Sequence, residues 1–130
     1  MGDNEIKKMN EEVLKKRFKD WAIKGVLLTR KFSNEPDFKA IRNQMVRCIP
    51  SCTANYRAAC RAKSTADFIN KLKIVEEELD ESMFWIEFIV DLDENLKNKT
   101  VDLHKEADEL LAITVSSIKT LRKKSQIQKS

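Results

Sequence analysis

The chain has 130 residues, of which 42% are hydrophobic and 35% charged, a mixture that excludes an intrinsically disordered chain. Its two glycines and two prolines are too few for the many tight turns of a sheet protein, and they favour a small number of long helices. No window approaches the roughly 18–20 consecutive apolar residues of a membrane span, so we expect no membrane association.

The N-terminal dozen residues are polar and lack the apolar stretch of a signal peptide, which favours a cytoplasmic protein. Three clustered cysteines, Cys48, Cys52 and Cys60, agree with this, because secreted disulfide scaffolds usually carry even and distributed sets. The net charge of +4 hides a segregation: residues 64–96 carry 10 acidic and 2 basic side chains, and the other segments are basic. One acidic helix among basic ones is therefore predicted.

The first helix is predicted over about residues 4–31, with Asn4 and Asn10 as alternative caps. Its core stripe follows 4-3-4-3-4 spacing. The stripe comprises Leu14, Phe18, Trp21, Gly25, Leu28 and Phe32.

The second helix is predicted over 36–62, with Asn34 as its N-cap and Pro36 in its first turn. Pro50 lies in its interior, where a proline removes one backbone hydrogen bond. Two alternatives stay open, a kinked but continuous helix, which we favour, or a break near residues 48–51.

The third helix is predicted over 65–96 and begins with a capping box, in which Ser64 is the cap and Asp67 replaces the usual Glu. The fourth is predicted over 100–123, and residues 124–130 are expected to fray. Short connections between four long helices predict one all-α domain, an antiparallel up-down-up-down four-helix bundle over residues 1–130.

Phe84, Trp85 and Phe88 are apolar residues of the third helix that lie outside its core stripe. A wide core-facing stripe would explain them. A subunit interface would also explain them, and we favour it because aromatic side chains are frequent anchors of interfaces.

A polar stripe at 3-4-4 spacing runs beside the core stripe of the second helix, and a group of carboxylates on the third helix is placed to face it. We interpret the set as a structural hydrogen-bond and ion-pair network in preference to a ligand or catalytic site. The set comprises Gln44, Arg47, Ser51, Asn55, Glu77, Glu78 and Glu81.

Four residues at the end of the second helix, Tyr56, Arg57, Arg61 and Lys63, combine basic and aromatic side chains. This combination can hold single-stranded nucleic acid through phosphate contacts and base stacking. The two arginines, at i and i+4, could equally pair with acidic groups of a neighbouring helix or subunit.

No catalytic or metal site is predicted. His104 is the only histidine, and no Glu-x-x-His pair accompanies the many carboxylates. Cys48 and Cys52 share a helical face but lack two further zinc ligands, so we expect them to be small buried hydrophobes. We therefore expect no cofactor and no enzymatic activity.

The second and third helices resemble the four-helix-bundle family associated with intervening sequences in 23S ribosomal RNA genes. The ordered positions Gln44, Arg47, Ser51, Ala54 and Asn55 match the family pattern. Further similarity is carried by residues 41–47, 54–64, 67–69 and 76–82 and by Trp85.

The similarity departs from the family at residues 56–59, where Tyr-Arg-Ala-Ala replaces the Ile-Ala-Glu-Gly of many members. Ala58 therefore cannot take any role of the missing Glu. The resemblance implies a bacterial, cytoplasmic homopentamer related to the accessory variability proteins of diversity-generating retroelements, which work with a reverse transcriptase and RNA. It carries over no catalytic residue.

Two functions follow as alternatives. The first is a non-catalytic oligomeric module that contacts RNA, DNA or a nucleic-acid enzyme, supported by the basic helices and the resemblance. The second is a protein-interaction scaffold with no nucleic-acid role, supported by the surplus apolar face.

Overall fold

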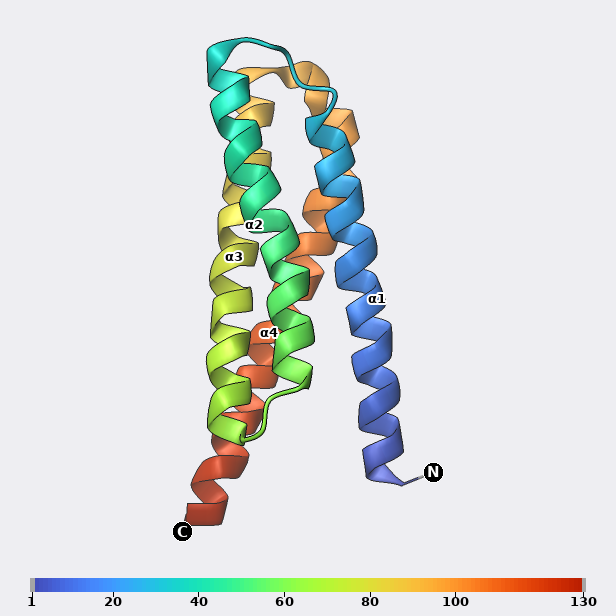
Figure 1. Ribbon diagram of the computed structural model, residues 1–130, viewed down its shortest axis with the longest axis vertical. Helices are drawn as coiled ribbons and strands as arrows, with labels where there is room; N and C mark the ends of the chain where they lie inside the picture. Colours follow the sequence, from blue (N-terminus) through green and yellow to red (C-terminus); the bar gives the residue numbers. More distant parts are fainter. Residues whose placement is uncertain (1, 130) are drawn as a thin grey trace.

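The computed structural model describes residues 2–129 and forms an antiparallel up-down-up-down bundle of four α-helices (Figure 1). Successive helices pack side by side and α4 closes on α1, so that α1 and α3 lie diagonally across the bundle. The predicted all-α four-helix bundle is confirmed. The elements are α1 (Asp3–Thr29), α2 (Pro36–Cys60), α3 (Thr65–Leu92), the 3₁₀ turn η1 (Glu94–Leu96) and α4 (Lys97–Lys129).

Helix α3 ends at Leu92 and not at Leu96 as predicted, because Asp93 adopts an extended conformation. The Asp93 carboxylate accepts a hydrogen bond from the Asn95 N–H at 3.1 Å, an alternative to continuing the helix. Helix α4 then begins at Lys97, three residues earlier than predicted. It continues to Lys129, six residues beyond the predicted end at 123, and no Gly or Pro interrupts this segment.

Helix α2 is continuous through Pro50, so the alternative of a break is wrong. Its N-cap position is Glu35 and not the predicted Asn34, and no side chain caps it. Helix α1 begins at Asp3 and ends at Thr29, which makes Asn10 an interior residue. The cap of α3 is as predicted, because the Ser64 hydroxyl accepts a hydrogen bond from the Asp67 N–H at 3.1 Å.

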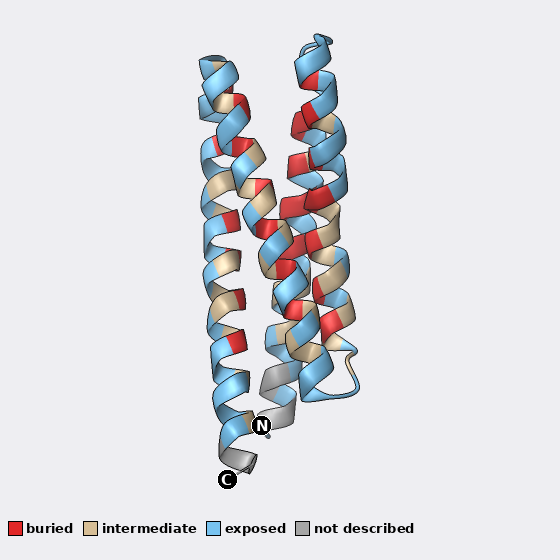
Figure 2. Ribbon diagram, turned by 90° about the vertical axis from the view of Figure 1, so that its left-hand side faces the viewer, coloured by how far each residue is buried: buried red, intermediate tan, exposed pale blue. Residues whose placement is uncertain are grey.

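The core runs along the bundle axis, and each helix contributes one inward stripe of buried side chains (Figure 2). Trp21 is 2% exposed, and its indole N–H donates to the Leu103 carbonyl at 2.9 Å, which fixes α1 on α4. Large side chains of this kind each contribute about 1.5–3 kcal/mol when buried. Arg42 bonds the Thr29 and Phe32 carbonyls, satisfying acceptors at the end of α1.

The cysteines of α2 belong to this core. Cys48 and Cys52 are fully buried, and the Ser82 hydroxyl donates to the Cys48 sulfur at 3.4 Å. Burial raises the pKa of both thiols, so they remain neutral. They act as small apolar groups at the α2–α3 contact.

Gly25 lies at a tight contact between α1 and α2. A Cβ placed there would lie 3.0 Å from Cδ1 and 3.1 Å from Cγ2 of Ile49, which is itself fully buried. Glycine costs a helix interior about 1 kcal/mol relative to alanine. The close contact explains why that cost is tolerated at this position.

We therefore expect the effect of Gly25→Ala to depend on Ile49. In the Ile49→Ala background, alanine at position 25 should stabilise by roughly 1 kcal/mol through helix propensity. With Ile49 present, the crowded methyl should offset that gain. Urea denaturation of the unmodified protein, the two single variants and the double variant measures the coupling free energy between the two positions. If Gly25→Ala changed the free energy of unfolding equally with and without Ile49, the proposed role of this contact would be contradicted.

Arg17 ties the middle of α1 to α4. Its guanidinium lies 2.5 Å from Oε1 of Glu106 and 2.9 Å from Oε2 of Glu109. The hydrogen bond from Arg17 outweighs burial and lowers the pKa of Glu106 below its ordinary value of 4.5. A carboxyl group with a lowered folded-state pKa stabilises the fold above its unfolded pKa, and this stabilisation is lost as the pH falls through the folded pKa.

Replacing Glu106 by Gln should therefore lower the free energy of unfolding at pH 7 by about 0.5–1 kcal/mol, as for partly exposed ion pairs. The difference from the unmodified protein should diminish as the pH is lowered from 7 to 3, because the stabilisation is lost as the pH falls through the folded-state pKa of Glu106. Asp20→Asn, which removes an exposed pair with Lys16, is the control and should change stability little at either pH. A Glu106→Gln effect that persists undiminished at pH 3 would contradict this role.

Candidate nucleic-acid interface

A basic groove of about 670 Å³ runs between α1 and α2. Its α1 side carries Lys15, Lys16 and Lys19, and its α2 side carries Arg57 and Arg61. We call these five cations and the space between them the basic groove. Thr53 and Ala54, both small, line it, and Glu12 is its single acidic residue.

The helical geometry explains how these cations meet. Lys15 and Lys19 are four residues apart, as are Arg57 and Arg61, so each pair lies on one helical face. The antiparallel packing of α1 and α2 then places the two faces opposite each other. Positive charge from two separated segments is thereby focused on one surface.

Three of the five cations form no ion pair in the part of the chain that the structure describes. Lys15 pairs with Glu12 at 3.0 Å and Lys16 with Asp20 at 2.8 Å. Within residues 2–129, Lys19, Arg57 and Arg61 have no carboxylate within ion-pair distance. The alternative that the two arginines pair with a neighbouring helix is therefore wrong for this chain, and the groove can accept an anionic group.

Tyr56 does not belong to this surface. Its ring is 6% exposed and stacks on Phe18, with ring centroids 4.7 Å apart. The predicted contact of Tyr56 with a base is wrong, because its ring faces the core. The 4-3 spacing of Cys52, Tyr56 and Ala59 was the signal that could have placed it there. Lys63 is exposed in the α2–α3 connection and does not line the groove.

The predicted polar network is only partly assembled. Arg47 pairs with Glu78 at 3.4 Å and also with Glu81, which accepts a further bond from the Trp85 indole N–H. Burial alone would raise the pKa of Glu81, but these bonds outweigh it and hold the pKa below its ordinary value. The pair ties α2 to α3 at the bundle surface.

The other members of that set lie elsewhere. The Asn55 amide donates to the Ser51 carbonyl at 2.9 Å and to its hydroxyl at 3.0 Å, which is a local contact within α2. Gln44 and Glu77 are exposed and take no part in the Arg47 network. Three of the seven residues, Arg47, Glu78 and Glu81, form a structural tie, and the other four take no part in it, so the set does not form a single site.

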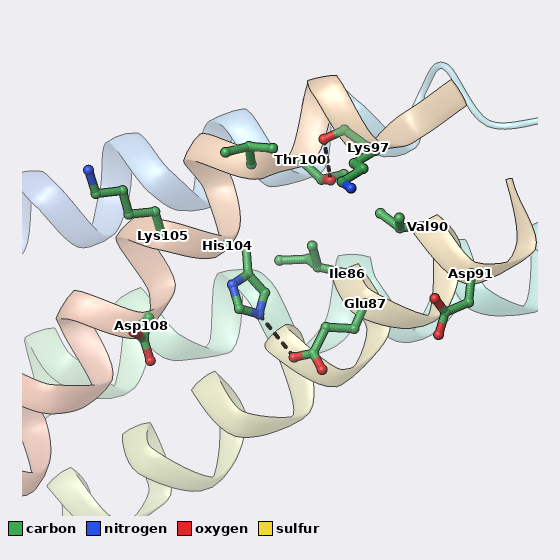
Figure 3. Close-up of a pocket in the computed structure, with 10 residues that line it drawn as sticks. Ile86, Glu87, Val90, Asp91, Lys97, Thr100, His104, Lys105 and Asp108 are labelled. Atoms are coloured by element: carbon green, nitrogen blue, oxygen red, sulfur yellow. Dashed lines mark hydrogen bonds and ion pairs between the residues drawn. The ribbon is translucent and has the colours of Figure 1, made fainter. Parts of the chain in front are cut away.

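A second hollow, of about 610 Å³, lies between α3 and α4 (Figure 3). His104 points across it and lies 3.0 Å from the Glu87 carboxylate. Lys97, Lys105 and Asp91 also line it and give it mixed charge. No three His, Cys, Asp or Glu side chains converge as metal ligands in the part of the chain that is described.

The aromatic residues of α3 outside the core form one exposed cluster. Phe84 is 53% and Phe88 40% exposed, and both rings contact Trp85, at centroid distances of 4.9 and 5.7 Å. Trp85 is half-buried beside the Arg47 network. The wide-core interpretation therefore fits Trp85 in part and does not fit the two phenylalanines.

The fold and the groove together define a four-helix bundle with a basic α1–α2 surface. The model of the 23S rRNA-intervening sequence protein family matches residues 10–116. The chain therefore belongs to that family, as its sequence resemblance indicates. The structure is also similar to a crystal structure of a protein of unknown function from the S23 ribosomal protein family of Bacteroides thetaiotaomicron VPI-5482. The similarity covers 82% of this chain and 98% of that chain, with a TM-score of 0.75 and 29% sequence identity.

No curated protein gives a match to this sequence. None of the helices in residues 2–129 is both long and apolar enough to cross a membrane. The family relationship is therefore the main guide to function outside the site itself.

Proposed function

We propose that the chain is a non-catalytic, oligomeric module that binds nucleic acid through the basic groove. The observation that carries this proposal is the meeting of five cations from α1 and α2 on one surface, three of them without an acidic partner in the described chain. Phosphate groups are the natural ligands of such a surface, and binding would be driven largely by counterion release.

The burial of Tyr56 defines the kind of contact that this surface would make. Without an aromatic platform, bases have no stacking partner in the groove. Contacts would fall on phosphates, which carry no sequence information directly. We therefore expect weak sequence preference in RNA or DNA and a strong dependence on salt.

The non-catalytic assignment rests on the chemistry of the nucleophile candidates. Cys48 and Cys52 are buried thiols whose pKa is raised, and among the described side chains His104 bonds a carboxylate and no thiol or hydroxyl. We also propose a homo-oligomer, a pentamer as the family resemblance implies, in a bacterial cytoplasm. The exposed Phe84 and Phe88 support an interface on α3.

The test of the groove is a double reversal, Arg57→Glu with Arg61→Glu, measured by fluorescence anisotropy with a labelled RNA hairpin and a DNA duplex. Binding should weaken at least tenfold. The slope of log K against log salt should become shallower by about 0.7–0.9 for each phosphate group that the variant no longer neutralises.

The matched control is Lys39→Glu with Lys105→Glu, two exposed cations outside the groove that undergo the same change in net charge. Equal weakening by both double variants would mean that total charge and not the groove determines binding. Absence of any salt-sensitive binding at micromolar protein would support the alternative function, a protein-interaction scaffold.

A further inference from the structure

The large apolar side chains that remain exposed are concentrated on two helices. Of ten such residues among those described, four lie on α1 and four on α3. Each set of four falls within about 80° of arc at 100° per residue, so it forms a stripe on the outer face of its helix. The α1 outer stripe is Met9, Val13, Ile23 and Leu27, and the α3 outer stripe is Ile74, Phe84, Phe88 and Leu92.

The two stripes match in length. Met9 to Leu27 and Ile74 to Leu92 each span 18 residue steps, or about 27 Å at 1.5 Å per residue. Each stripe has apolar side chains at both ends, and charged side chains fill the gap between Val13 and Ile23 on α1 and between Ile74 and Phe84 on α3. Two helices with this distribution can pack along their whole shared length.

Their charges are opposite. Residues 9–27 carry five basic and three acidic side chains, and residues 74–92 carry seven acidic and no basic ones. Charge complementarity of this kind selects a partner and fixes its register. An acidic stripe would repel a second copy of itself, which disfavours α3 packing on α3.

The stripes cannot cover each other within one chain. Helices α1 and α3 lie diagonally across the bundle, and their outer faces point away from each other (Figure 1). One molecule therefore presents both surfaces at once, on different sides. Each surface remains available to a different neighbour.

We propose that the α3 outer stripe of one copy packs in parallel against the α1 outer stripe of the next copy. This proposal rests on the proposed homo-oligomerisation and names the two surfaces that carry it. Such a head-to-tail interface is heterologous, and it closes into a ring when the rotation between copies allows. Helices α1 and α3 run in the same direction, so rotation about an axis along the bundle keeps them parallel.

The parallel register pairs three of the four apolar residues of each stripe with one another, and Val13 comes level with Glu78. Aligning Met9 with Ile74 also aligns Ile23 with Phe88 and Leu27 with Leu92. In the middle section, Lys16 comes opposite Glu81, so that opposite charges meet there. Arg57 and Arg61, on α2, stay outside this contact and remain available to an anion.

The test uses two variants that each block one surface. Phe88→Arg blocks the α3 stripe, and Leu27→Glu blocks the α1 stripe. Analytical ultracentrifugation should show an oligomer for the unmodified protein and the 15.1 kDa single chain for each variant alone. An equimolar mixture of the two variants should form a dimer of twice that mass, because one intact surface of each kind remains.

Val101→Arg is the matched control, since Val101 is 52% exposed on α4 outside both stripes, and it should leave the oligomer unchanged. The far-ultraviolet circular dichroism spectrum shows that each variant is folded. A monomeric unmodified protein would overturn the proposed oligomerisation itself. If the unmodified protein is an oligomer, three results would overturn only the proposed contact between the α1 and α3 outer stripes. These are a blocked variant that keeps the mass of the oligomer, a single variant that forms dimers alone, and a mixture of the two variants that does not form dimers.

Discussion

The buried contact between α1 and α2, which includes Gly25 packed against Ile49, holds the two helices together, and the basic groove depends on that packing. Five cations on facing helices repel one another, by about 1 kcal/mol for a pair 4 Å apart in water. Attraction between these side chains therefore cannot hold the groove together. Buried packing along the α1–α2 contact holds the two backbones in place. The two helices thereby position the cations as a positively charged surface.

Helical periodicity predicted the core well because burial repeats with the turn of the helix. Phe18, Trp21, Leu28 and Phe32 were all placed by spacing alone, and all are buried. The end of α3 and the start of α4 were harder to predict, because Leu96 is buried and so fits the periodicity of a helix that continues through it. The change there depends on the backbone conformation of Asp93, which hydrophobic spacing does not report.

The candidate site was predicted less completely, for a different physical reason. Arg57 and Arg61 could be noticed because they are close in sequence. Their opposite side, which includes Lys19, depends on the antiparallel register of two helices, and charge counts contain no information on register. Tyr56 was misplaced because its basic neighbours are typical of a nucleic-acid surface, although its own position continues the core stripe.

The acidic helix has a consequence for partners. Of the seven carboxylates in residues 74–92, only those of Glu78, Glu81 and Glu87 form ion pairs with other residues of the described chain. The other four carboxylates form no ion pair in the described chain, although the other three helical segments are basic. Helix α3 packs its core side against α2 and α4, and it therefore presents most of these carboxylates to the outside. A polyanion avoids that face, and a basic helix is attracted to it. The segregation of charge thus favours a polyanion at the basic α1–α2 surface and a basic protein helix at the acidic outer face of α3.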